Sequence, residues 1–99
     1  MTVSFTDAEV TAMEAALKKW GIIAQAGQAV EECAELIVAL QKYANRSANA
    51  ETVEKILDEI ADVEMMLAQM RVALGISDGA LRRRIEEKFS KFREYLARE

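Results

Sequence analysis

The sequence predicts an all-α protein, and both its composition and its apolar pattern indicate this fold class. Proline is absent and glycine occurs only four times, so long helices meet few interruptions. Apolar residues make up 52% of the chain. Between Val53 and Leu74 they recur at the three- and four-residue spacing of a helix. A length of 99 residues fits one domain, so we expect a single four-helix domain over residues 1–99.

The first helix is expected over residues 7–19 and the second over residues 22–44. Thr6 and Glu9 have the spacing of a capping box, in which each side chain satisfies a free backbone amide at a helix start. Gly21 separates the two helices, because glycine adopts the left-handed conformation beyond a helix end without steric cost. Residues 45–49 are short and polar, and they predict a loop.

The third helix is expected to begin near Ala50 and to end at Gly75. Its apolar stripe consists of Val53, Ile56, Ile60, Val63, Leu67, Met70 and Leu74. Further apolar residues cover other directions, namely Leu57, Ala61, Met65, Met66 and Ala68. This breadth predicts a helix buried on several sides, either at the centre of a bundle or shared with another subunit.

The fourth helix is expected to follow a cap at Ser77 or Asp78. It carries a narrower apolar stripe of Leu81, Ile85, Phe89, Phe92 and Leu96. Its opposite face is charged, with pairs four residues apart at Arg82/Glu86, Arg83/Glu87, Glu87/Lys91 and Glu94/Arg98. Four helices with such broad apolar surfaces exceed what one small bundle can hide, which predicts self-association.

Charge and residue usage exclude several classes of function. Residues 1–79 carry 6 basic and 13 acidic side chains, whereas residues 80–99 carry 7 basic and 4 acidic ones, so the last helix is locally basic. The acidic total of −4 does not favour binding to a nucleic-acid polymer. Histidine is absent, which excludes Ser-His and Cys-His catalysis and every histidine-based metal site.

The sequence also predicts a cytoplasmic protein with no membrane partner. No charged leader and no run of about 18 apolar residues is present. Cys33 is the only cysteine, so an intramolecular disulfide is impossible. We expect Cys33 and the five methionines to pack in the core.

Two acidic motifs carry the candidate chemistry. Glu32 and Glu35 are three residues apart and project from one helix face, and Glu59 and Asp62 repeat this geometry on the third helix. If the short loop makes the two helices antiparallel neighbours, the four carboxylates can converge. Hard oxygen ligands of this kind suit Mg²⁺ or Mn²⁺.

The alternative is that these acids only solvate an exposed helix face, where each acid normally has a base one turn away. Four residues after the acids stand Leu36, Ala39, Val63 and Met66, and none is basic. Four residues before them stand Gln28, Glu31, Lys55 and Asp58, so one base serves four acids. Unpaired acids in a partly buried place repel one another, and a bound cation offsets that repulsion.

The pattern resembles a known family. Glu31-Glu32-x-x-Glu35, followed after 23 residues by Glu59-x-x-Asp62, is similar to the signature of MazG-like, all-α nucleoside triphosphate pyrophosphohydrolases. The similarity extends to Trp20-Gly21, to Gln25, and to the sequence around residues 35–37 and 60–63. It covers residues 20 to about 74 well and the flanking helices only in kind.

The resemblance implies a four-helix MazG-like bundle completed by oligomerisation as a homodimer or homotetramer. It also implies Mg²⁺-dependent hydrolysis of nucleoside triphosphates to monophosphate and pyrophosphate, as in house-cleaning of nucleotide pools. Glu32, Glu35, Glu59 and Asp62 would then ligate Mg²⁺. Glu31 would be an accessory ligand or a water-orienting base. Several glutamates lie within reach of the attacking water, so spacing leaves the general base open.

Substrate contacts are expected at both ends of the motif region. Trp20 can stack on a base while Gln25 or Gln28 reads its edge or the sugar, although ordinary packing or solvation also explains each of them. On the fourth helix, the candidates for the β- and γ-phosphates are Arg84, Lys88 and Lys91, with ion pairing or solvation as the alternative.

Two other readings of the same helices remain open. In the first, the protein is a non-enzymatic helical oligomer whose acids contact Arg82–Arg84 of another subunit. In the second, it is a di-iron carboxylate bundle, which the lack of any Glu-x-x-His motif weakens.

Overall fold

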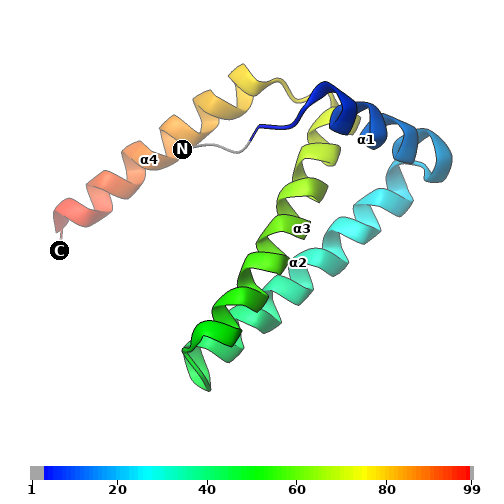
Figure 1. Ribbon diagram of the computed structural model, residues 1–99. Coiled ribbons are helices and arrows are strands. Elements are labelled where there is room, and N and C mark those ends of the chain that lie inside the picture. Colours follow the sequence, from blue (N-terminus) through cyan, green and yellow to red (C-terminus); the bar gives the residue numbers. More distant parts are fainter. Residues whose placement is uncertain (1–3, 99) are drawn as a thin grey trace.

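The computed structural model describes residues 4–98, which form four α-helices and no strand (Figure 1). The helices are α1 (Asp7–Trp20), α2 (Ile22–Asn45), α3 (Ala50–Leu74) and α4 (Asp78–Arg98). The all-α prediction is therefore confirmed. Within the described residues, no helix is both long and apolar enough to cross a membrane.

The predicted signals at the first helix are present. The amide of Glu9 donates to Thr6 Oγ1 at 3.1 Å, and the amide of Thr6 donates to Glu9 Oε1 at 2.8 Å. Gly21 has a φ of 87°, which explains why glycine stands between α1 and α2. Helices α1 and α2 each continue one residue further than the sequence predicts.

The ends of α3 and the start of α4 are also set by local signals. Asn49 Oδ1 accepts a hydrogen bond from the amide of Thr52 at 3.0 Å and so caps α3. Gly75 is left-handed with a φ of 65°. Of the two predicted caps for α4, Ser77 has this role, because its Oγ accepts from the amide of Ala80 at 3.1 Å.

Helices α2 and α3 run antiparallel and side by side as a hairpin, and α1 packs across the end of the hairpin that lies far from the 46–49 loop (Figure 1). Helix α4 leaves the top of α3 and points away from the hairpin. No Cα atom of α4 lies within 8 Å of a Cα atom in α1, α2 or α3, although Leu81 and Ile85 at its start are half-buried. Within one chain, three helices pack together and the fourth stands apart, so the single chain does not close a four-helix bundle.

The core of the described chain is small. Its buried apolar residues are Met13, Ala39, Val63 and Ala68. The prediction that the third helix is buried on several sides is wrong for the single chain. Leu57 and Met65 are more than half exposed, because α2 covers only one side of α3 and α1 covers only part of another.

The predicted apolar stripe of α3 is divided between two environments. Val63 is buried and Ile56 and Met70 are half-buried. The members at seven-residue intervals are exposed, namely Val53, Ile60, Leu67 and Leu74. Cys33 and Met65 are exposed, so their predicted places in the core are wrong. Met13 is buried, Met66 and Met70 are half-buried, and Met1 lies outside the described residues.

Candidate metal centre

The two acidic motifs meet where α2 and α3 pack against each other. Glu32 and Glu35 come from α2, and Glu59 and Asp62 come from α3. One carboxylate oxygen from each of the four residues lies within 4.8 Å of the other three. The convergence expected from the antiparallel hairpin is therefore present. Glu31 is exposed and lies outside this group.

Glu59 is the deepest member of the cluster, with 3% of the residue exposed. Its Oε1 forms an ion pair with Nζ of Lys55, which stands one turn earlier on α3, at a distance of 2.8 Å. Its Oε2 is inaccessible to solvent and has no hydrogen-bond partner. A buried carboxylate oxygen without a partner is costly, since folding removes its water without replacing the lost hydrogen bonds.

Glu32 repeats this arrangement on the other helix. Gln28 Nε2 donates to Glu32 Oε1 at 2.9 Å, which fixes the carboxylate by one oxygen. Glu32 Oε2 is again inaccessible and without a partner. Each helix thus supplies one carboxylate that is held by its Oε1 while its Oε2 is left unsatisfied. This is the kind of donor that a cation can complete.

The charges of neighbouring acids act on the Glu35 carboxyl. The pKa of the Glu35 carboxyl is raised above its usual value of 4.5, first by the charge of Glu32 and then by that of Glu59. The pKa of Lys55 is also raised, mainly by its hydrogen bond to Glu59 and by the charge of that residue. One ammonium group therefore faces several carboxylates, and negative charge remains in excess.

The donor set fits a small, hard divalent cation. Oxygens on opposite sides of Mg²⁺ lie about 4.2 Å apart, because each contact is roughly 2.1 Å long. The widest separation here is 4.8 Å. The four oxygens are thus gathered in a volume similar in size to the shell of one divalent cation. Larger, flexible shells such as that of Ca²⁺ span up to about 5.2 Å, so the geometry alone does not select magnesium.

The predicted glutamines have different positions. Gln28 touches the cluster through Glu32. Gln25 instead accepts a hydrogen bond from the amide group of Gln69, which is buried on α3. This pair joins the two helices across their interface, so in the single chain Gln25 has a structural contact and does not face an open site.

Trp20 lies at the end of α1, away from the acids. It is 58% exposed, and Lys19 Nζ stands 5.1 Å from its ring centroid. The ten residues of α2 between Ile22 and Glu32 span about 15 Å at the helical rise of 1.5 Å per residue. Trp20 is therefore not packed in the core, and it is not in contact with the cluster.

The structure does not bring the predicted phosphate-binding residues to the acids. Arg84, Lys88 and Lys91 all lie on α4, which makes no contact with the hairpin. Arg84 pairs with Glu87 at 3.6 Å, and Arg82 pairs with Glu86 at 3.5 Å as predicted. Glu87 thus contacts Arg84 and not Arg83 or Lys91, because a three-residue spacing is also a neighbour position on a helix.

Two residues of the site were not among the predicted site residues. Lys55 stands four residues before Glu59, and this spacing was the signal that it would pair with that acid. Gln69 offered a weaker signal as a polar side chain within a largely apolar stretch of α3. Its partner on α2 could not be read from spacing along a single helix.

Comparisons of this chain with protein-family models, with curated proteins and with solved structures found no match.

Proposed function

We propose that this protein is a Mg²⁺-dependent nucleoside triphosphate pyrophosphohydrolase whose reaction centre is the acidic cluster. Its products would be a nucleoside monophosphate and pyrophosphate, released after in-line attack on the α-phosphorus. Mn²⁺ is the alternative cation. The proposed substrate is a free nucleotide, not a nucleic-acid polymer, and the proposed compartment is the cytoplasm.

One observation carries this proposal. Two buried carboxylate oxygens, Glu32 Oε2 and Glu59 Oε2, have no partner although their other oxygens are held in place. Solvating acids keep their oxygens in water, and structural acids satisfy them with donors. The MazG-like resemblance of the same four residues narrows the reaction from cation binding in general to hydrolysis of a triphosphate.

The chain's own residues would have separate tasks. Glu32, Glu35, Glu59 and Asp62 would hold the cation, and Glu31 would orient water or take its proton. When bound, Mg²⁺ lowers the pKa of its water and withdraws charge from phosphate oxygens. Gln28 and Lys55 would fix the orientation of the Glu32 and Glu59 carboxylates. Each contacts the Oε1 atom of its glutamate and leaves the Oε2 atom for the cation.

Self-association into a homodimer or homotetramer is part of this proposal. Ile37 and Ile60 each stand two residues from an acid of the cluster, a rotation of about 200° on a helix. The hairpin therefore has an acidic face and, opposite to it, an apolar face that includes the exposed residues Val30, Ile37, Val53, Ile60 and Leu67. A four-helix core would form where two such apolar faces meet. Arg84, Lys88 and Lys91 would then reach the phosphates from a neighbouring copy.

The test is a product assay over a panel of ribo- and deoxynucleoside triphosphates with Mg²⁺. It compares wild type with Glu35→Gln, and it uses Glu86→Gln as a matched control, because Glu86 undergoes the same chemical change on α4. We expect monophosphate and pyrophosphate from wild type and from the control. We expect little product from Glu35→Gln.

Three results would contradict the proposal. Equal activity in Glu35→Gln and wild type would remove the acidic cluster from the reaction. Diphosphate and inorganic phosphate as products would place the attack at the γ-phosphorus. Absence of hydrolysis, together with no Mg²⁺-dependent rise in thermal stability, would remove the enzyme hypothesis altogether.

A second candidate function is a non-enzymatic helical oligomer, and the large exposed apolar surface favours it. In that case the acids would contact the arginines of residues 82–84 in another copy. Charge-reversal pairing separates the two functions. If Glu35→Lys dissociates the oligomer and Arg83→Glu restores it, the acids are interface groups and not cation ligands.

A further inference from the structure

Helix α4 is a regular helix without a tertiary partner in its own chain. It spans Asp78–Arg98 and makes no contact with α1, α2 or α3. Its own sequence specifies it locally, through the Ser77 cap and the ion pairs Arg82–Glu86 and Arg84–Glu87. In proteins, most of the stability of a helix comes from packing of its apolar face against another surface. A surface that covers the apolar face of α4 would therefore stabilise it.

One side of α4 is built for burial. The α4 stripe consists of Leu81, Ile85, Phe89, Phe92 and Leu96. Phe89 and Phe92 pack edge to face with ring centroids 6.0 Å apart, and both rings are about half exposed. Lys88 projects from the same sector of the helix, so contact through this stripe would place its ammonium group at the interface.

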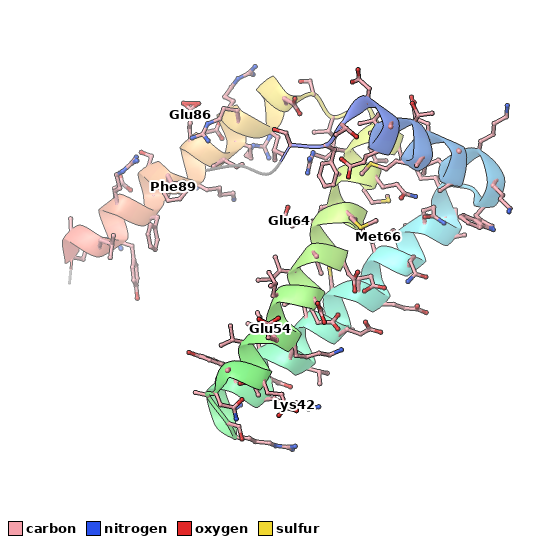
Figure 2. The ribbon with its side chains drawn as sticks, in the orientation of Figure 1. Lys42, Glu54, Glu64, Met66, Glu86 and Phe89 are labelled. Carbon is pink, nitrogen blue, oxygen red and sulfur yellow. The ribbon has the colours of Figure 1, made fainter. Side chains whose placement is uncertain are left out.

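The start of the α4 stripe opens into a cleft of about 850 Å³. Leu81 and Ile85 form its α4 wall. The opposite walls are Phe5, Val10 and Met13 at the N-terminal side and Ala68 and Val72 on α3. Glu64 lies on the side of α3 that borders the same cleft (Figure 2). The apolar walls of the cleft thus continue into the exposed aromatic part of α4.

The link between α3 and α4 holds α4 away from its own hairpin. The amide of Ile76 donates to the Arg71 carbonyl at 2.9 Å, and the amide of Gly75 donates to the Val72 carbonyl at 3.3 Å. Ser77 then caps α4 directly. Only three residues separate the helices, and all three are used in these end structures, so α4 cannot fold back onto α2 without breaking them.

The chain exposes more surface than a compact monomer of its size, and the excess is large enough for an interface with a second copy. The accessible surface is 7927 Å², whereas a compact monomer of 11.1 kDa has about 5,700 Å². The radius of gyration is 16.2 Å, compared with about 12.6 Å for a compact domain of this length. The excess of roughly 2,200 Å² per chain exceeds the ~800 Å² that each partner contributes to a standard interface.

The distribution of charge along the chain also favours a second copy as the partner of α4. The segment 80–99 carries a net charge of +3, and the rest of the chain carries −7. We call helices α1, α2 and α3 together the body of the chain. Approach of α4 from one copy to the acidic body of another is therefore electrostatically attractive. Two α4 helices, by contrast, would repel each other. This asymmetry selects contact between α4 and the body of the second copy.

We infer that α4 is an exchanged arm, whose apolar stripe packs against the body of a second copy of this chain while the cleft beneath it receives a helix of that copy. The inference rests on the self-association proposed above but not on the hydrolysis. The arm would be required for assembly, and the hairpin alone would not hold the oligomer together.

Sedimentation velocity at several protein concentrations tests this arm. Phe92→Glu places a charge in the α4 stripe, and Arg83→Gln makes the same change in net charge on the polar side of α4. We expect wild type and Arg83→Gln to sediment at a multiple of 11.1 kDa. We expect Phe92→Glu to weaken association by about 30-fold or more, the loss that follows disruption of an interface hot spot. Circular dichroism checks that the variant keeps its helices.

Hydrogen exchange of wild type at high and low protein concentration gives an independent readout. We expect the amides of α4 to lose protection on dilution, together with the loss of oligomer. Protection of α4 that persists in the monomer would overturn the exchanged arm. An oligomer unchanged in Phe92→Glu would overturn it too, while leaving self-association intact. A wild-type mass of 11.1 kDa at every concentration would overturn both.

Discussion

Helices α3 and α4 are of similar length and both carry acidic and basic residues, but their charges are arranged in opposite ways. On α4, Arg82 and Arg84 pair with glutamates of the same helix, and these groups remain in solvent. On α3, Glu59 is buried and only one of its oxygens has a partner. Neighbour spacing along one helix is thus sufficient to pair charges on a solvated face, whereas the environment of the α3 acids also depends on α2, which packs against them.

The same two helices also differ in how their apolar residues are used. On α3, the residues that face α2 include Glu59 beside Val63, and the larger apolar side chains at Ile60 and Leu67 stay exposed. On α4, Phe89, Phe92 and Leu96 of the apolar stripe are exposed, whereas Leu81 and Ile85 at its start border the cleft and are half-buried. In both helices, large apolar side chains are therefore left exposed in the part of the chain that the structure describes. On α3, the buried side also contains the charged residue Glu59 beside Val63.

The largest expected effect is on hydrolysis, and it contrasts two glutamates of α3. Glu59→Gln removes a proposed ligand, and Glu54→Gln makes the same change at an exposed site five residues earlier on α3. Residues that only support a ligand typically contribute about 10–100-fold, so we expect Glu59→Gln to reduce kcat/KM by more than about 100-fold. The measurement is steady-state pyrophosphate release. Equal rates in the two variants would remove the functional distinction between buried and exposed acids.

The next effect is on stability and contrasts the hairpin with α4. Ala39 is 3% exposed on α2, so a leucine there overpacks the contact with α3. We expect Ala39→Leu to lower the free energy of unfolding by about 1–3 kcal/mol. Ala97→Leu on α4 should change it by less than about 0.5 kcal/mol. Chemical denaturation followed by circular dichroism measures both, and similar losses would mean that the two helices are equally packed.

A smaller effect is expected at the helix starts. Asn49 caps α3 through a 3.0 Å hydrogen bond, and Asn49→Ala should cost about 1 kcal/mol of global stability. Ser77→Ala removes the cap of α4. Because α4 does not contact the hairpin, we expect this loss as fraying of α4 in hydrogen exchange, with the hairpin unaffected. Global destabilisation by Ser77→Ala would show that α4 unfolds together with the hairpin.

The smallest effect is a dependence of stability on pH without added cation. The folded state raises the pKa of Glu35, which means that it disfavours the ionised form. Stability therefore increases as the pH falls through this raised pKa, and the gain is complete below the ordinary value of 4.5. We expect Glu35→Gln to be more stable than wild type at pH 7 and the difference to vanish near pH 4. Glu86→Gln should show no such trend in thermal melts.

Most of the local structure could be predicted from the sequence because it depends on local chemistry. Thr6 and Gly75 set helix ends through backbone groups within a few residues, and the capping box and the left-handed glycine are present as expected. Gly21 also ends its helix with a positive φ, but its ψ of 160° differs from the predicted left-handed conformation. The convergence of Glu32 and Glu59 required only an antiparallel hairpin with a short loop. The missing bases around these acids were visible from their neighbours along each helix.

The remaining features depend on contacts between helices, which periodicity does not report. A helical pattern gives the direction of Leu57 or Met65 around the axis but not whether another helix covers that direction. The pairing of Gln25 with Gln69 joins residues 44 positions apart. The position of Lys88 relative to the acids depends on where α4 points, and this is set by the link at residues 75–77.

The central claim is that the acidic face of the hairpin binds a divalent cation, and Mn²⁺ binding followed by electron paramagnetic resonance tests it most directly. Wild type, Glu59→Gln and Glu54→Gln are titrated without nucleotide, and Mg²⁺ is used as competitor. We expect that wild type and Glu54→Gln bind Mn²⁺, that Mg²⁺ displaces it, and that Glu59→Gln binds it at least about 10-fold more weakly. Equal Mn²⁺ binding by Glu59→Gln and wild type, or no binding by wild type, would contradict it.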